Sequence, residues 1–441
     1  MLPQIDETHD PALHCWVTSA RVEGTDFPIQ NLPFGIFRRR GNAEPWRGGV
    51  AIGDQIVDLA AWHRLGLFDG LAAKAAAVAA AGPDLNRFAA LGRPYWTALR
   101  AALSRLLSAA SAPPGAEAAL VPMAAVDLGL PVTPGNYTDF FCSLEHATNA
   151  GRVMRPGQAA VGENFRWMPI AYHGRASSIR VSGTPCRRPL GQRRDDPAAP
   201  PAYGPTGRLD YETELGCIVG PGSMLGKPVP LAEAETHILG LCLLNDWSAR
   251  DIQRFEYQPL GPFLGKSFLT SLSPWVVTLE ALAPFRVPAR PRSGPEEPVA
   301  LPYLADEVDA ARGGFDIAVS AALSTAAMRR DGRPPFVLGT ANARWLYWTP
   351  AQMLAHHTSN GCDLQPGDIF GTGTISGFGA GEQGCLLEIT ANGRTPVALP
   401  SGEVRRFLED GDEVILSARC ERQGYVPIGF GTCRGVVVPA I

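Results

Sequence analysis

The stretch Leu209-Asp-Tyr-Glu-Thr-Glu-Leu-Gly-Cys-Ile-Val219 carries mostly apolar residues at odd positions, and its even positions begin with Asp210, Glu212 and Glu214. This alternation is typical of a half-buried β-strand, in which side chains two positions apart project from one face. The Cα atoms of Glu212 and Glu214 are then expected roughly 6.5 Å apart, at about 3.3 Å per residue. Two carboxylates that close repel each other, and a shared Mg²⁺ or Ca²⁺ ion would relieve the repulsion. A strand whose polar face meets water is the simpler alternative.

The size and composition of the chain indicate a globular protein. Its 441 residues, 45% hydrophobic and 19% charged, are enough for a large core and about two or three domains. The net charge of −4 argues against nucleic acid and anionic membranes as partners. The first residues are acidic rather than apolar, and no run reaches the roughly 18 apolar residues of a membrane span. We therefore expect a cytoplasmic protein.

The cysteine pattern supports the same compartment. Nine cysteines are an odd number, and none forms a Cys-x-x-Cys pair. Several lie in apolar runs, where a reduced thiol behaves as a small hydrophobic group. The pattern predicts a reducing environment and argues against a zinc ribbon or a disulfide framework.

Changes in amino-acid composition along the chain predict its domain organisation. Short strands are expected within residues 14–62, and the Ala- and Leu-rich segments 70–81 and 95–109 have helical spacing. From about residue 131, short apolar runs alternate with Gly and Pro, which predicts a β-rich domain. Residues 187–208 are interpreted as a long loop, and residues 285–300 as a surface segment.

Two groups downstream of the acidic stretch are candidates for chemistry. Residues 238–246 form an apolar run that ends in Asn-Asp, which places Asp246 at the end of a buried strand. Lys266 follows Gly265 in an apolar segment, and a buried lysine needs a partner. An isolated lysine is more often on the surface, so Lys266 is a candidate functional residue only because of the residues around it.

Upstream, Thr138 or Asp139 is predicted to cap a helix that carries Cys142 and His146 four residues apart. His146 could act as a general base, since its ordinary pKa is near neutral. A thiolate–imidazole nucleophile formed with Cys142 is a rival interpretation. A purely structural histidine is the third.

The chain contains several longer motifs: Asp26-Phe-Pro-Ile-Gln-Asn-Leu-Pro-Phe-Gly35, Tyr137-Thr-Asp-Phe140, Tyr172-His-Gly-Arg-Ala-Ser-Ser178, Asn245-Asp-Trp-Ser-Ala-Arg-Asp251, Pro259-Leu-Gly-Pro-Phe-Leu-Gly-Lys266 and Gly373-Thr-Ile-Ser-Gly377. Together these motifs resemble a known family, that of fumarylacetoacetate hydrolase (fumarylacetoacetase). The resemblance covers nearly the whole chain. It implies a mainly β fold with α, an SH3-like N-terminal domain over residues 1–130, and a mixed β-roll catalytic domain over residues 131–441. A homodimer is also implied.

The resemblance further implies roles for individual residues. The metal-associated positions, with Mg²⁺ or Ca²⁺ as cofactor, would be Asp139, Glu212, Glu214, Asp246, Lys266 and Thr270. The catalytic positions would be His146 as base, Glu388 as its orienting carboxylate, and Arg250, Gln253 and Lys266 around an oxyanion. Substrate contacts would be Phe141, Arg155, Tyr172, Gln253, Tyr257 and Thr374. The family usually has Tyr where this chain has Phe141, so one hydroxyl contact to a substrate carboxylate is missing.

The implied reaction is cleavage of the carbon–carbon bond of 4-fumarylacetoacetate, a small diketo acid, to fumarate and acetoacetate. Three alternatives stay open. A related enzyme of the superfamily would hydrolyse an acylpyruvate, decarboxylate or isomerise. A cysteine hydrolase would use Cys142 with His146. A metal-binding scaffold would have no turnover.

Overall fold

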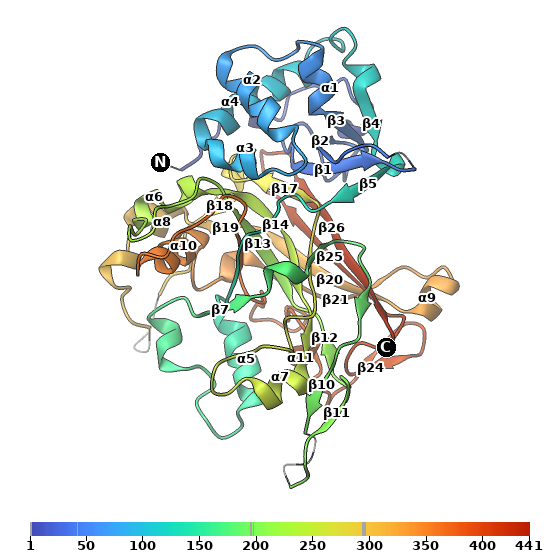
Figure 1. The fold of residues 1–441 in the computed structure, drawn as a ribbon, viewed down its shortest axis with the longest axis vertical. Coiled ribbons are helices and arrows are strands. Elements are labelled where there is room, and N and C mark those ends of the chain that lie inside the picture. The colour runs from blue at the N-terminus through green and yellow to red at the C-terminus, as the bar shows by residue number, and fades with distance from the viewer. Residues whose placement is uncertain (1, 42, 195, 197, 293–296) are drawn as a thin grey trace.

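In the first 130 residues a group of strands is followed by a group of helices and then by further strands, and in Figure 1 these elements form the upper part of the molecule. The computed structural model describes residues 2–41, 43–194, 196, 198–292 and 297–441. The strands here are β1 (Phe34–Arg39), β2 (Arg47–Ile52), β3 (Gln55–Asp58), β4 (Leu120–Pro122) and β5 (Val126–Gly129). The helices are α1 (Leu59–Arg64), α2 (Leu71–Ala80), α3 (Asn86–Leu91) and α4 (Arg93–Leu107).

Helices α2 and α4 confirm the helices predicted over 70–81 and 95–109. Helix α2 buries four alanines, and α4 buries Leu99 and Leu103 along one face, so the small side chains let the two helices approach closely. Helix α3 was not predicted, because it is short and ends at Gly92 directly before α4.

A single sheet joins these strands to the rest of the chain. Strand β1 pairs antiparallel with β17, with Gly35 opposite Trp275. The sheet continues through β14, β13, β22, β6 and β7. Their bounds are β17 (Trp275–Thr278), β14 (Ile238–Asp246), β13 (Thr213–Val219), β22 (Ile369–Gly371), β6 (Tyr137–Phe140) and β7 (Ala171–Gly174). Strand β16 (Thr270–Leu272) pairs with β14 and with β8 (Ile179–Val181).

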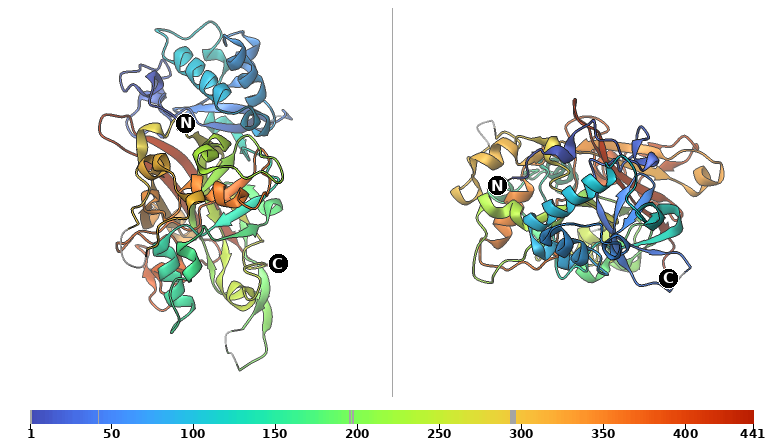
Figure 2. Two further views of the ribbon diagram at one scale, coloured as in Figure 1. Left: turned by 90° about the vertical axis from the view of Figure 1, so that its left-hand side faces the viewer. Right: turned by 90° about the horizontal axis from the view of Figure 1, so that it is seen from above.

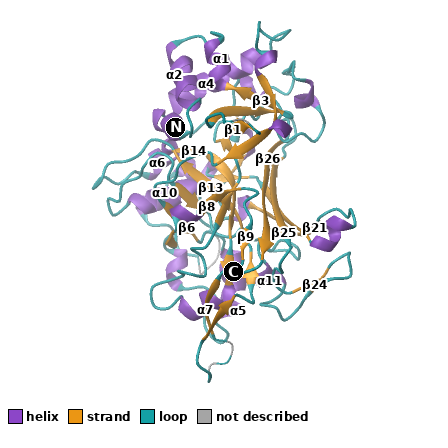
Figure 3. Cartoon of the chain, turned by 45° about the vertical axis from the view of Figure 1, so that its right-hand side comes forward, coloured by secondary structure: helices purple, strands orange, loops and turns teal. Residues whose placement is uncertain are grey.

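A second sheet lies beside the first, as the strands in Figure 3 show. Its order is β21 (Phe336–Asn342), β20 (Ala318–Ser324), β25 (Glu413–Cys420), β26 (Ile428–Val438) and β9 (Cys186–Arg187). One hydrophobic cluster contains side chains of both sheets, among them Leu243 of β14, Val319 of β20 and Phe430 of β26. The core of the larger part of the protein therefore lies between the sheets.

Short helices and ribbons cover this core from outside (Figures 1 and 2). The helices are α5 (Leu144–Met154), α6 (Leu231–Ala234), α7 (Arg250–Glu256), α8 (Glu307–Arg312), α9 (Ala326–Arg330), α10 (Pro350–Thr358) and α11 (Leu386–Ile389). Two-stranded ribbons are formed by β12 (Leu209–Asp210) with β15 (Ser248–Ala249), β18 (Arg286–Val287) with β19 (Gly314–Phe315), and β23 (Val397–Ala398) with β24 (Val404–Arg405). Among the described residues, none of the helices has the length and apolar character needed to cross a bilayer.

Two segments differ from their sequence-based interpretation. The loop expected over 187–208 contains a hairpin of β10 (Leu190–Arg193) and β11 (Ala202–Pro205), which projects at the bottom of Figure 1. Its Arg- and Pro-rich composition hid the pairing, and residues 195 and 197 lie outside the described residues. The segment 285–300 was expected on the surface, but Phe285 and Arg286 are buried, and Arg286 forms an ion pair with Glu235. Residues 293–296 lie outside the described residues.

The predicted class, mainly β with α and with an N-terminal domain ahead of a larger one, is confirmed. The exact division at residue 130 stays a prediction, because β1 and β5 share a sheet with strands from far along the chain.

The contact between β1 and β17 leads to a first prediction. A Cβ added at Gly35 would lie 2.5 Å from the Trp275 ring and 2.6 Å from the Pro274 carbonyl oxygen. Because one of these neighbours is backbone, Gly35→Ala is expected to lower the free energy of unfolding by about 1–3 kcal/mol. Gly204→Ala is the matched control, since nothing lies within 4 Å of its added Cβ. Denaturant unfolding with equal effects for both variants would contradict the close contact.

Candidate active site

The acidic stretch is buried along its whole length rather than facing water. It forms two strands, β12 and β13, so the continuous strand predicted over 209–219 is wrong at Tyr211 and Glu212. Two side chains cause the break: the Glu212 N–H donates to the side-chain oxygen of Asn245 at 3.1 Å, and the Tyr211 N–H donates to Asp210 at 2.9 Å. Side chains thus replace sheet partners at these two residues.

Four carboxylates converge at this point from three strands and the β12–β13 junction. Asp139 lies in β6, Glu212 precedes β13, Glu214 lies in β13 and Asp246 ends β14. Each offers an oxygen within 4.8 Å of the others, and all four residues are buried. The sequence prediction that these acids meet is therefore correct in space.

A glycine makes room for the cluster. Strand β22 lies between β13 and β6, with Gly371 opposite Asp139. A Cβ at Gly371 would lie 2.3 Å from Asp139 Oδ1 and 2.9 Å from Glu214 Oε2. Only a residue without a side chain lets both carboxylates enter the same space.

Two cations face one side of the cluster. Lys266 Nζ donates to Glu212 Oε2 at 2.5 Å and to Asp246 Oδ2 at 2.8 Å, and Arg250 Nη1 donates to Glu212 Oε1 at 2.8 Å. Burial alone would raise the pKa of Glu212, but Lys266 and Arg250 hold it well below the usual range. Burial would likewise lower the pKa of Lys266, yet Asp246 and Glu212 raise it, so the amine keeps its proton.

On the other side of the cluster, no cation of the described residues pairs with the acids. Asp139 Oδ1 and Glu214 Oε1 have no hydrogen-bond partner among the described residues. Burial, followed by the neighbouring carboxylates, raises the pKa of both side chains. Buried, unpartnered carboxylate oxygens that converge on one another are the ligands a hard divalent cation prefers. The residues present therefore fit a metal site.

Lys266 and Thr270, which the resemblance grouped with the metal, contact the acids. Thr270 Oγ1 donates to Asp246 Oδ1 at 3.1 Å, and the Tyr172 hydroxyl donates to Asp246 Oδ2 at 2.6 Å. A protonated amine has no lone pair for a metal. In this geometry the role of Lys266 is to neutralise and orient carboxylates, while its place among the metal-associated residues stays a prediction.

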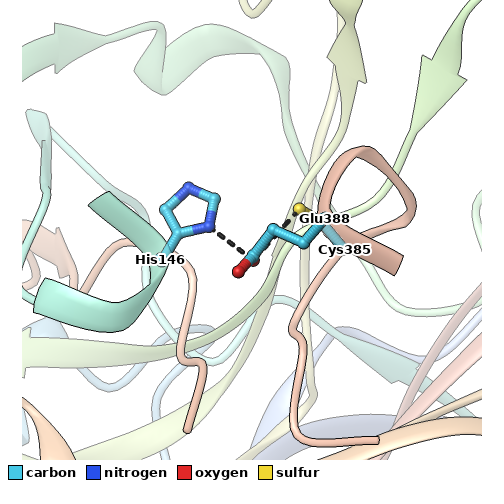
Figure 4. Close-up of side chains that lie close together, drawn as sticks. All are labelled: His146, Cys385 and Glu388. Carbon is cyan, nitrogen blue, oxygen red and sulfur yellow. Dashed lines mark hydrogen bonds and ion pairs between the residues drawn. The ribbon is translucent and has the colours of Figure 1, made fainter. Parts of the chain in front are cut away.

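The histidine is also held by a carboxylate. His146 Nδ1 lies 2.6 Å from Glu388 Oε1, and both side chains are almost completely buried (Figure 4). Burial would raise the pKa of Glu388, but His146 and other donors lower it, so the carboxylate is ionised and accepts the proton on Nδ1. Nε2 is then free to accept a proton, as a general base requires.

The helix that carries His146 begins later than predicted. The residue before α5 is Ser143, whose hydroxyl accepts the His146 N–H at 3.2 Å, whereas Thr138 and Asp139 lie in β6. Cys142 therefore lies outside the helix, and burial raises the pKa of its thiol well above the ordinary value. The structure gives no support to a thiolate–imidazole nucleophile.

Asp210 is a residue whose role the sequence analysis missed. It accepts the backbone N–H groups of Leu386 and Leu387 at 2.8 and 2.9 Å, and it accepts Arg250 Nε at 2.9 Å. The one sequence feature that indicated a role for Asp210 was the alternation, which placed it on the same face of the predicted strand as Glu212. Asp210 connects α11, which carries Glu388, to the arginine beside the acids.

A cavity of about 620 Å³ joins these groups. All six predicted substrate contacts line it, together with His146, Arg250, Lys266, Asp139 and Glu212. Glu388, Glu214, Asp246 and Thr270 lie behind this lining. Glu388 binds His146, Asp246 binds Lys266, Glu214 accepts the Gly373 N–H, and Thr270 in turn binds Asp246. His173, Met154 and Leu260 also line the cavity and were not predicted.

Fold and site together define a class of protein. Residues 136–438 match the family described as the C-terminal part of fumarylacetoacetate (FAA) hydrolase, and residues 30–131 match the one described as the fumarylacetoacetase N-terminal part. The chain belongs to the fumarylacetoacetate hydrolase family.

Individual relatives are similar over nearly their full length. Fumarylacetoacetase of Oryza sativa subsp. japonica is 48% identical, with 95% of this chain and 96% of the relative covered. The Bos taurus and Homo sapiens fumarylacetoacetases are 47% and 45% identical, each with 95% of this chain and 98% of the relative covered. A solved structure of fumarylacetoacetate hydrolase from Exiguobacterium antarcticum has a TM-score of 0.50 at 17% identity and covers 92% of this chain and 99% of that one, which supports the fold alone.

The unpartnered oxygens lead to a prediction about metal binding. Glu214→Gln removes one anionic ligand and is expected to weaken binding of Mg²⁺ or Ca²⁺ at least about tenfold. Isothermal titration with each ion measures the change. Glu117→Gln makes the same chemical change at an exposed residue and should bind as the parent protein does. Equal affinity in both variants would remove Glu214 from the metal site.

The position of Asp210 leads to a prediction about stability. Asp210→Asn removes the charge that pairs with the buried Arg250 and turns one acceptor oxygen into an NH2 group that faces a donor, which is expected to cost about 3–5 kcal/mol of unfolding free energy. Asp127→Asn is the control, because Asp127 pairs with Arg38 and Arg40 on the surface and should matter by about 1 kcal/mol or less. Urea unfolding of both variants compares the two losses.

Proposed function

We propose that this protein is a fumarylacetoacetase, which uses water to cleave 4-fumarylacetoacetate into fumarate and acetoacetate, the last step of tyrosine and phenylalanine degradation. Family membership and the full-length relatives support the reaction. The observation that carries the proposal is one cavity lined by a buried acid cluster, a carboxylate-held imidazole and two cations. These groups are the ones needed for hydrolysis of a carbon–carbon bond, in which the leaving group carries negative charge on carbon.

The cofactor is proposed to be Mg²⁺ or Ca²⁺, held by Asp139, Glu212, Glu214 and Asp246. Such an ion would polarise the diketone and stabilise the negative charge that develops on the departing carbon. The choice between the two ions stays a prediction, since carboxylate oxygens suit both.

His146 is proposed to take a proton from water through Nε2. The resulting hydroxide attacks the carbonyl on the fumaryl side, the carbon–carbon bond breaks, and its electron pair goes to the acetoacetate carbon. That carbon regains a proton from the imidazolium, so His146 returns to its starting state. Glu388 accepts the Nδ1 proton throughout and stabilises the positive charge on the ring.

Arg250, Gln253 and Lys266 are proposed to face the oxygen that becomes negative during attack. Arg250 Nη2 is buried and has no hydrogen-bond partner in the described chain, and Arg250 Nη1 lies 3.3 Å from Gln253 Oε1. A free donor held in place by Asp210 and Glu212 is pre-organised for a developing charge. Each such donor is worth about 2.7–4 kcal/mol of barrier.

The end of the cavity around Phe141 is proposed to receive the acid group of the substrate. Phe141 packs edge-on against His146, with ring centroids 5.2 Å apart, and has no hydroxyl. Arg155 and Tyr257, which line the same cavity, are left to hold the carboxylate, with Tyr172 and Thr374 beside the diketone. A homodimer and a cytoplasmic location complete the proposal and are tested by light scattering and by fractionation.

The base assignment gives a direct test. His146→Ala is expected to lower kcat by about 10²- to 10⁴-fold while Mg²⁺ or Ca²⁺ affinity stays unchanged, because the ring is hydrogen-bonded to Glu388 and, among the described residues, to none of the four acids. Steady-state kinetics and metal titration measure the two effects. The Cys142→Ser variant should retain activity. An inactive Cys142→Ser variant would instead support the alternative of a cysteine hydrolase.

The reaction itself is tested with a panel of diketo acids and product analysis. Fumarylacetoacetate is expected to give fumarate and acetoacetate in equal amounts. Preferred cleavage of an acylpyruvate, or release of carbon dioxide, would instead assign the chain to a related activity of the superfamily.

A further inference from the structure

Glu388 is surrounded by four hydrogen-bond donors from three parts of the chain. Its Oε1 accepts from His146 Nδ1 at 2.6 Å, from Ser376 Oγ at 2.7 Å and from Cys385 Sγ at 3.4 Å. Its Oε2 accepts from Asn149 Nδ2 at 2.9 Å. The side chain has no exposed surface, so water does not replace these donors.

The hydrogen bonds around Ser376 determine to which acceptor its hydroxyl donates its proton. The Gly384 N–H donates to Ser376 Oγ at 3.1 Å, which uses an acceptor position of the hydroxyl. The remaining proton therefore goes to Glu388 Oε1. The backbone of Ser376 is also bound to Ser143, whose hydroxyl precedes α5 and donates to the Ser376 carbonyl oxygen at 3.3 Å.

Asn149 lies one turn after His146 on the same face of α5. The helix thus presents two donors to Glu388, the ring nitrogen to one oxygen and the amide to the other. Because the two contacts engage different oxygens, they fix the rotation of the carboxylate as well as its distance from the ring.

The three side chains in Figure 4, His146, Cys385 and Glu388, carry ligand types that zinc accepts, so a metal site here is an alternative. The hydrogen bonds argue otherwise. Glu388 Oε1 already accepts three donors, and burial raises the pKa of Cys385, so the thiol keeps its proton. The cluster holds a charged carboxylate rather than an ion.

We propose that Asn149 and Ser376 are positioning residues for the base: they hold Glu388 in the one orientation that keeps the proton of His146 on Nδ1 and leaves Nε2 open to water. Neither residue lines the cavity, so neither touches the substrate. The inference rests on the proposed function, because it assumes that His146 is the base.

The test uses the full-length protein with Asn149→Leu, Ser376→Ala and the double variant. Each single change is expected to lower kcat about 10-fold, and the double change about 100-fold, with KM and metal affinity within about twofold of the parent. Asn149→Asp keeps the size of the side chain and places a second carboxylate against Glu388, so it should be at least as slow. Thr148→Val is the matched control on α5, because among the described residues the Thr148 hydroxyl bonds the Leu144 carbonyl oxygen and not Glu388.

A second measurement separates positioning from general damage. Nitrogen NMR of the histidine side chains, with His146 identified from the His146→Ala spectrum, reports which ring nitrogen carries the proton. The parent and Thr148→Val should show a proton on Nδ1, whereas the double variant should show a mixture with Nε2. Loss of kcat with an unchanged His146 signal would overturn the inference, as would full activity in the double variant.

Glu388→Gln and His146→Ala decide which proposal has failed. If both keep full kcat, the base assignment is wrong. If both lose kcat while the Asn149 and Ser376 variants keep it, only the positioning role is wrong.

Discussion

The burial of negative charge is the constraint on which the rest of this structure depends. Four carboxylates share a space in which any two ligand oxygens lie within 4.8 Å, and among the described residues two cations reach them, both from one side. Such a group is unfavourable in a protein interior unless further positive charge is present. The pKa of Glu212 is held low, whereas that of Glu214 is raised, so the deficit lies on the side of Glu214 and Asp139. Protonation or a bound cation would relieve this repulsion, and the converging oxygens fit a cation.

The sheet topology makes this arrangement possible. Strands β6, β13, β14 and β22 come from four separate parts of the chain, yet they are adjacent in one sheet. The register places Gly371 opposite Asp139, so the sheet supplies both the acids and the space between them. Helices α5 and α7 bring His146 and Arg250 to the same cavity, and α11 places Glu388 behind His146. Three of the four acids lie on strands of the sheet, whereas His146, Arg250 and Glu388 lie on helices.

Local patterns predicted much of this, and the failures have identifiable causes. Helical spacing located α2 and α4, and the apolar run 238–246 located β14 with Asp246 at its end. The resemblance named every predicted residue that lines the cavity. Alternation alone could not reveal that the acidic strand breaks at Tyr211, because Asn245 replaces the sheet partner from 33 positions away. The roles of Asp210, Asn149 and Ser376 likewise depend on partners remote in sequence, and no periodicity encodes such contacts.

The pairing of β1 with β17 has a consequence for how defects in this protein would act. This seam lies at the N-terminal end of the molecule, and none of its residues lines the cavity. A destabilising substitution in the β1–β17 pairing would lower the number of molecules that escape degradation by cellular proteases. Each folded molecule that remains would still convert substrate at the normal rate. Damage at Asp210 would reduce abundance and turnover together. Small molecules that assist folding would therefore rescue the first kind of variant and not the second.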